Sequence, residues 1–241
     1  MTRKKTSVVS TCHAANLTAV PRNPAVARQA GNTLVWSLVV LGGLGVVAVL
    51  IWLALGMLER SRINSVIESL NGTAAAVFAY QDRYGRTPGD DGPAASLAAR
   101  GTHWSTVTAG DVDGRLDIGI NQLFTGNGES GPFWQQLRAS GFWSGDPAVS
   151  GQAALPRNPW GGLLSALADE MGGGLAGNKV CTSQVPGAAA LAIDLQLDDG
   201  DGATGRLRAT PGNRGVDTNP SNAPLSRPYS EEVDYTICYR M

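Results

Sequence analysis

Four aspartates near residue 200 have the chemistry of a cation site. They are Asp194, Asp198, Asp199 and Asp201. Calcium prefers several carboxylate and carbonyl oxygens on a flexible loop, and the turn that holds these aspartates could supply them. The spacing does not follow the alternating ligands of an EF-hand loop. A solvated turn that caps a helix explains the same residues, and the sequence favours this turn over calcium.

Two further groups of residues also invite a chemical interpretation. Asp111, Asp113 and Asp117 form a second and weaker candidate for a metal site. A set of aromatic residues could present a surface that binds a sugar or a partner: Phe133, Trp134, Phe142, Trp143 and Trp160. Because aromatic side chains in a small domain more often fill the core, we expect these residues to be structural.

Catalysis has little support in the sequence. The chain has only two histidines, His13 and His103. The stretch around His103 lacks a nucleophile elbow, and no metalloprotease or phosphate-loop pattern occurs. We therefore expect a protein that is not an enzyme and that requires no cofactor.

The elements that position these residues begin with one predicted membrane segment. No charged residue occurs between Gln29 and Leu58, and a helix over 34–58 is long enough to cross a bilayer core. Five basic residues and no acidic residue precede Glu59, whereas the rest of the chain carries 14 basic and 20 acidic residues. The positive-inside rule then places the N-terminus in the cytoplasm and the acidic remainder outside the inner membrane. An acidic domain with scattered arginines shows no direct signal for nucleic-acid binding.

The apolar run is longer than that of a secretory signal peptide, and no small-residue cleavage pattern follows it. Helical spacing continues beyond the run, through Ile63, Val66 and Leu70. The pattern predicts one helix from about residue 33 to about residue 83, which Gly85 and Pro88 end.

Several stretches in a fixed order resemble the type IV pilin and type II secretion pseudopilin family. Basic residues, Gly31, a polar residue and Thr-Leu-Val before the apolar run resemble the prepilin cleavage motif. The stretch 78–90, which ends in Tyr-Gly-Arg-Thr-Pro-Gly-Asp, resembles the end of the long helix in many pilin-like proteins. Similar stretches follow over 110–114, at Glu129, over 133–142 and over 180–239, so the resemblance covers most of residues 28–241.

The resemblance implies processing by prepilin peptidase. The peptidase would cut between Gly31 and Asn32, and the new N-terminal Asn32 would be methylated. Thr33, Leu34, Val35 and Trp36 would then be the positions that govern assembly. The implied organisation is a cleaved basic leader over 1–31, a transmembrane and filament-core helix over 32–58, an exported half of that helix over 59–84, and a head over 85–241.

Trp36 departs from the family pattern, because most pilins have a glutamate at this position. That acid pairs with the N-terminal amine of a neighbouring subunit, and a subunit at the filament tip has no neighbour above it. The departure favours a minor or tip-proximal subunit of a type IV pilus or a type II secretion pseudopilus. The alternative is an uncleaved single-pass inner-membrane protein whose periplasmic domain binds a ligand or a partner.

The resemblance also implies partners and a location. The expected partners are other pilin or pseudopilin subunits, prepilin peptidase, the inner-membrane assembly platform and membrane lipid. The head would be periplasmic before assembly and part of a surface filament or a pseudopilus afterwards. Some members of the family bind calcium in a comparable loop of the head, which keeps calcium possible for the four aspartates near residue 200.

The exported part is predicted to have an α+β fold, with a small antiparallel sheet that packs on the exported half of the long helix. We expect helices over 132–140 and 188–197, strands over 206–209 and 233–239, and loops over 142–178 and 210–228. Two cysteines are exported, Cys181 and Cys238, while Cys12 lies in the leader. A disulfide between the exported pair is the simplest expectation in an oxidising compartment, and two buried free thiols are the alternative.

Overall fold

The computed structural model describes residues 24–172, 174–221 and 228–241, without the side chains of residues 24–31 and 34. The expected leader therefore lies largely outside the described residues. The chain divides into two compact units, Met1–Leu53 and Ala54–Met241. Each unit is described by itself.

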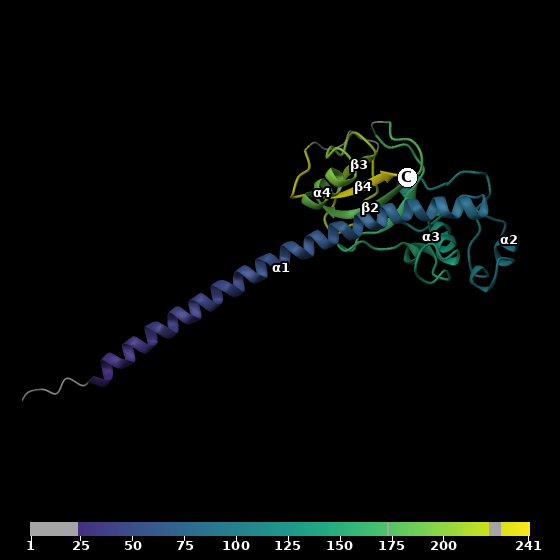
Figure 1. Cartoon of the computed structure of the whole chain (residues 1–241). Coiled ribbons are helices and arrows are strands. Elements are labelled where there is room, and N and C mark those ends of the chain that lie inside the picture. The colour runs from purple at the N-terminus through teal and green to yellow at the C-terminus, as the bar shows by residue number, and fades with distance from the viewer. Residues whose placement is uncertain (1–23, 173, 222–227) are drawn as a thin grey trace, which may run out of the picture. The chain divides into compact units, whose positions relative to one another are not determined.

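Helix α1, Pro24–Tyr84, accounts for all the described residues of the first unit and for the beginning of the second (Figure 1). It begins earlier than the predicted start at residue 33. Proline is favoured at the first position of a helix, and the following stretch, Ala-Val-Ala-Arg-Gln-Ala, has good helix formers. The helix ends as predicted: Gly85 has a φ of 66°, and its N–H donates to the carbonyl of Gln81 at 2.8 Å.

The second unit has an α+β fold with four antiparallel strands. After α1 it contains these elements: α2 Ala94–Ala98, η1 Thr102–Trp104, η2 Ile120–Gln122, α3 Ser130–Ala139, η3 Gly151–Ala154, β1 Leu164–Leu167, β2 Lys179–Pro186, α4 Gly187–Leu197, β3 Leu207–Gly212 and β4 Asp234–Arg240. The strand order is β1-β2-β4-β3. Figure 1 shows α4 beside the labelled strands β3 and β4.

The two central strands are joined by the expected disulfide. Cys181 of β2 lies directly opposite Cys238 of β4 in the antiparallel register, and the two residues form a disulfide. Both are fully buried. The prediction of a bridge is confirmed, and the alternative of two free thiols is excluded.

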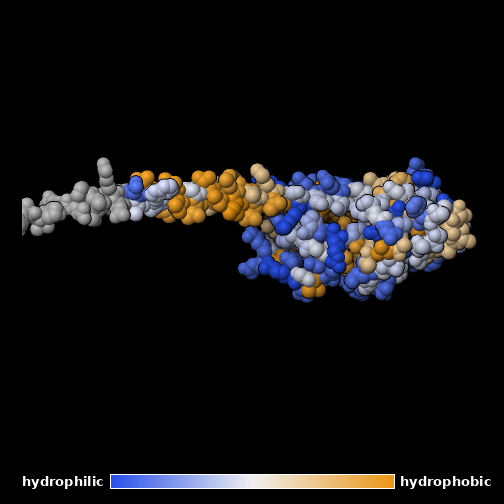
Figure 2. Space-filling model, turned by 90° about the horizontal axis from the view of Figure 1, so that it is seen from below, coloured by the Kyte–Doolittle hydropathy of each residue, from blue (hydrophilic) through white to orange (hydrophobic). Residues whose placement is uncertain are grey.

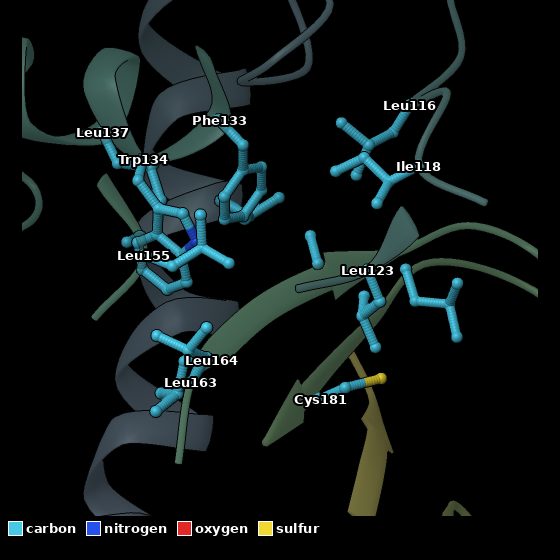
Figure 3. Packing of buried hydrophobic residues seen from close by; sticks show 14 of the residues in the cluster. Leu116, Ile118, Leu123, Phe133, Trp134, Leu137, Leu155, Leu163, Leu164 and Cys181 are labelled. Atoms are coloured by element: carbon cyan, nitrogen blue, oxygen red, sulfur yellow. The ribbon is translucent and has the colours of Figure 1, made fainter. Parts of the chain in front are cut away.

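The second unit has two hydrophobic cores, and α1 contributes to both. Ile63, Val66 and Leu70 of α1 pack with residues of α4 and of β2, β3 and β4. Further along the helix, Val77 and Tyr80 join the other core, which contains α3, β1 and the segments between them. Figure 3 shows part of this core, where Trp134 of α3 lies beside Leu155, with Leu163 and Leu164 below it and Phe133 on the side of Leu116 and Ile118. The expected packing of the sheet on residues 59–84 of α1 is therefore present.

The prediction of a loop over 142–178 was wrong, because β1 lies within it, and β2 was not predicted. All four residues of β1 are buried, so the strand has no alternation of polar and apolar residues that could mark it. In β2 the buried residues include Thr182 and Ser183, whose polar groups bond to Asn158. A buried polar strand of this kind becomes recognisable only through its partners. Strand β3 also extends to Gly212, beyond the predicted end at residue 209.

The disulfide generates a stability prediction. It joins residues that are 57 positions apart, and the chain-entropy model gives such a closed loop about 4 kcal/mol of stabilisation. We expect a double Cys181→Ala, Cys238→Ala variant of the full chain in detergent to lose about that much free energy of unfolding, measured by urea denaturation. Adding a reductant during unfolding should destabilise the wild type and leave the variant unchanged. An unchanged midpoint in both experiments would contradict the prediction.

Candidate functional site

The most extensive unusual surface is the apolar part of α1. Every large hydrophobic side chain from residue 35 to residue 58 is exposed, and none of these side chains is less than 46% exposed. This helix is long and apolar enough to cross a membrane, and none of its most apolar window is buried. Figure 2 shows the hydrophobic surface of this part of the helix in orange. Because the window is exposed, it is not the core helix of a globular domain, and a membrane anchor is compatible with it.

The residues of the predicted processing and assembly positions lie at the start of this surface. The prediction placed Gly31 ahead of the long helix, but Gly31 lies within α1. Nothing further is described for Gly31 or for the side chain of Leu34. Asn32, Thr33 and Val35 are exposed. Trp36, where the family resemblance would lead one to expect an acid, is 67% exposed.

Polar residues separate the apolar surface from the part of α1 that packs in the second unit. Glu59 is the first carboxylate of the chain, and Arg62 pairs with it at 3.4 Å. An exposed pair of this kind contributes little stability. Its position matters more, because it places charges on the helix where the exposed apolar run stops.

The structure brings together three of the four predicted calcium ligands. Asp194, Asp198 and Asp199 each offer a carboxylate oxygen within 4.8 Å of the others, and Asp201 is not part of this group. Asp194 is fully buried and accepts a hydrogen bond from Tyr229 Oη at 2.7 Å. Burial raises the pKa of Asp194, and burial together with the bond to Asp194 raises the pKa of Tyr229.

The same carboxylates already serve the turn as hydrogen-bond acceptors. Asp198 accepts the N–H of Leu207 at 2.8 Å and that of Arg206, so it anchors the beginning of β3. Asp199 accepts the N–H of Asp201 at 2.9 Å and the hydroxyl of Thr204 at 2.7 Å. These bonds account for the aspartates as parts of a capped turn, while calcium at this place stays a prediction.

Asp111 belongs to two acidic groups, of which the sequence predicted one. Asp111, Asp113 and Asp117 do lie together, and all three are exposed. Asp111 also belongs to another group, with the buried residues Asp90 and Glu129. Sequence reasoning noticed Asp90 and Glu129 only as parts of the family resemblance and missed their proximity. Burial raises the pKa of Asp90, and burial with the nearby charges of Asp90 and Asp111 raises that of Glu129 to about 7.

Two of the five aromatic residues belong to the hydrophobic core and cannot form a binding surface. Phe133 and Trp134 are fully buried, as expected. Phe142 and Trp143 are partly buried against the same core, and Trp160 is partly buried against the other. A separate open pocket of about 570 Å³ lies between the loop 114–119 and residues of 168–178, and its lining is mainly polar.

Comparisons with known proteins add no family to these observations. No protein-family model, no curated protein and no solved structure matches this chain.

The acidic turn after α4 generates a prediction that separates its two interpretations. Asp198→Ala removes the acceptor of two backbone N–H groups, so we expect a loss of about 1–3 kcal/mol in the free energy of unfolding. Asp199→Ala is the matched control, because its bonds lie within an exposed turn, and we expect a smaller loss. If the carboxylates serve the turn, the loss for Asp198→Ala is the same with calcium and with a chelator. A loss that occurs only in calcium would overturn this interpretation.

Proposed function

We propose that this chain is a pilin-like structural subunit, minor or tip-proximal, of a type IV pilus or a type II secretion pseudopilus. The observation that carries the proposal is the exposed apolar surface of α1 over 35–58. It belongs to a helix whose later residues form part of the core of a small α+β unit with an antiparallel sheet. The prepilin-like motif around Gly31 and the stretch that ends in Asp90 support the same proposal.

The mechanism proposed for the chain is mechanical. Before assembly the apolar helix lies in the inner membrane, with the basic N-terminus on the cytoplasmic side. During assembly, contacts with lipid are exchanged for contacts with the helices of neighbouring subunits. Burying one Val or Leu side chain that water would otherwise contact stabilises a protein by roughly 1.5–3 kcal/mol, so the surface over 35–58 cannot remain in water.

Glycines in the apolar run support close packing with neighbouring helices. A Cβ atom added at Gly42, Gly43, Gly45 or Gly56 would have no atom of the described chain within 4 Å. Among the described residues, nothing therefore requires glycine at these positions. Small residues allow the backbones of two membrane helices to approach each other closely. The glycines thus suit a helix whose packing partners belong to other subunits.

Trp36 supports the minor or tip-proximal role. It is exposed on the helix and carries no acid with which to neutralise the amine of an adjacent subunit. In a low-dielectric filament core, an amine without such a partner is costly, so repeated stacking of this subunit is disfavoured. A single copy at the tip avoids that cost.

The first test of the proposal is processing. When the chain is produced together with prepilin peptidase, we expect the mature protein to begin at Asn32 and to carry one N-terminal methyl group, as measured by intact mass and N-terminal sequencing. Gly31→Val should block the cut, whereas Gly43→Val, a matched change inside the apolar run, should leave it intact. Retention of Met1 by the wild type would overturn the proposal and favour the uncleaved single-pass protein.

The second test concerns assembly. Trp36→Glu restores the acid of the family pattern, so we expect more copies of the subunit along the filament and not only near its tip, as counted by immunogold labelling. Trp52→Glu is the matched control, because it places the same charge in the middle of the apolar run and should reduce membrane insertion. If Trp36→Glu leaves the number and position of the copies unchanged, the account of Trp36 is wrong.

A further inference from the structure

Three carboxylates from separate segments of the second unit meet at one place. Asp90 follows the end of α1, Asp111 lies in the loop 110–114, and Glu129 immediately precedes α3. A carboxylate oxygen of each residue lies within 4.8 Å of those of the other two. Asp90 is 1% exposed and Glu129 is 7% exposed, while Asp111 is open to solvent.

No basic side chain neutralises this group among the described residues. The ion pairs found there join Arg62 to Glu59, Arg100 to Asp91 and Arg214 to Asp234. The next residue in the chain, Asp91, is neutralised. Its carboxylate accepts hydrogen bonds from the guanidinium of Arg100 at 2.6 Å and from the hydroxyl of Tyr80 at 2.6 Å. Like charges this close disfavour one another unless a cation lies between them.

Glu129 supplies an independent indication of a ligand. Its Oε2 accepts the N–H of Asp117 at 2.6 Å. Its buried Oε1 has no hydrogen bond of ordinary geometry among the described residues, although the backbone N–H of Asp111 lies near the same carboxylate. A buried carboxylate oxygen without a partner is costly. Since the side chain is more than nine-tenths buried and reaches the oxygens of Asp90 and Asp111, a cation at this place would satisfy it.

The backbone around Asp90 is shaped to hold the carboxylates together. The N–H groups of Asp113 and Gly114 donate to the two oxygens of Asp90 at 3.0 and 3.1 Å. Each oxygen keeps a further lone pair for a metal. Gly110 permits the close approach of this loop, because a Cβ atom there would lie 2.3 Å from the carbonyl oxygen of Gly89.

We propose that Asp90, Asp111 and Glu129 form a calcium site of this chain. Two ligand oxygens on opposite sides of a calcium ion lie about 4.8 Å apart, so all three oxygens can contact one ion. Magnesium usually keeps most of its waters and takes one or two carboxylates, whereas calcium accepts several carboxylates on flexible loops. The exposed side, at Asp111, leaves room for water to complete the coordination. The proposal does not depend on the pilin-like function.

Bound calcium would fasten three parts of the second unit to one another: the end of α1, the loop 110–114 and the beginning of α3. The loop continues into 114–119, which lines the open pocket. Calcium would therefore also order one wall of that pocket.

The test compares thermal unfolding of the full chain in detergent with a chelator, with calcium and with magnesium. At a calcium concentration about 100 times its Kd, we expect the unfolding midpoint to rise by roughly 5–10 °C. Magnesium at the same concentration should give a much smaller rise. Isothermal titration calorimetry of the folded wild type should show one calcium ion for each chain at this site.

Variants locate the site. Glu129→Gln is the one that preserves folding, whereas Asp90→Asn also loses the acceptor of one of the two backbone N–H groups that bond to Asp90. Glu129→Gln and Asp90→Asn should each abolish the rise in calcium. Glu129→Gln should unfold at the same temperature as the wild type or higher in chelator, because it removes a buried like charge and can still accept the N–H of Asp117. Asp199→Asn, in the other acidic group, is the matched control and should keep the rise.

Three results would overturn the proposal: no rise with calcium in the wild type, a rise that persists in Glu129→Gln, or an equal rise with magnesium. A rise that disappears in Asp199→Asn and persists in Asp90→Asn would assign calcium to the turn after α4 instead.

Discussion

The second unit depends on the burial of one face of α1. Ile63, Val66, Leu70, Val77 and Tyr80 recur at helical spacing, and all five are buried. The first three belong to the core with α4 and the sheet, and the last two belong to the core with α3. Each such side chain contributes roughly 1.5–3 kcal/mol on burial. Removing this part of the helix would open both cores at once, so residues 63–80 of α1 fold as part of the α+β unit.

The same helix meets a different requirement before Glu59. There the apolar residues cover all its faces and remain exposed, whereas after Arg62 most large apolar residues occupy one face and are buried, with Phe78 as an exposed exception. The part of the helix after Arg62 is stable in water because its apolar face is covered by the domain, whereas the part before Glu59 is not. A helix with both patterns needs an apolar environment for one part and a folded domain for the other. This division connects the fold to the proposed role of an anchored subunit.

Local patterns in the sequence predicted the elements whose environment they reflect. The helical repeat predicted most of α1, Pro186 and the apolar positions after it predicted α4, and alternation predicted β4. The sequence did not predict β1, because all its residues are buried. It did not predict β2 either, because the buried polar residues of this strand bond to Asn158, which lies in another segment. The proximity of the carboxylates of Asp90 and Glu129 was not predicted for a related reason. They are far apart in the chain, and only the packing of α3 against the residues after α1 brings them together, where the N–H of Gly89 donates to Gln136 of α3 at 2.6 Å. The disulfide could be predicted, since only two cysteines lie outside the predicted leader.

Assembly through the apolar surface of α1 is the central claim, and site-specific crosslinking in cells tests it most directly. A photoreactive phenylalanine analogue at Leu50 would be placed on a residue that is 60% exposed in the single chain. The account predicts crosslinks to the apolar helices of other pilin-like subunits when the assembly machinery is active, and crosslinks to lipid when its motor is inactivated. Crosslinks to lipid alone under both conditions would contradict the account.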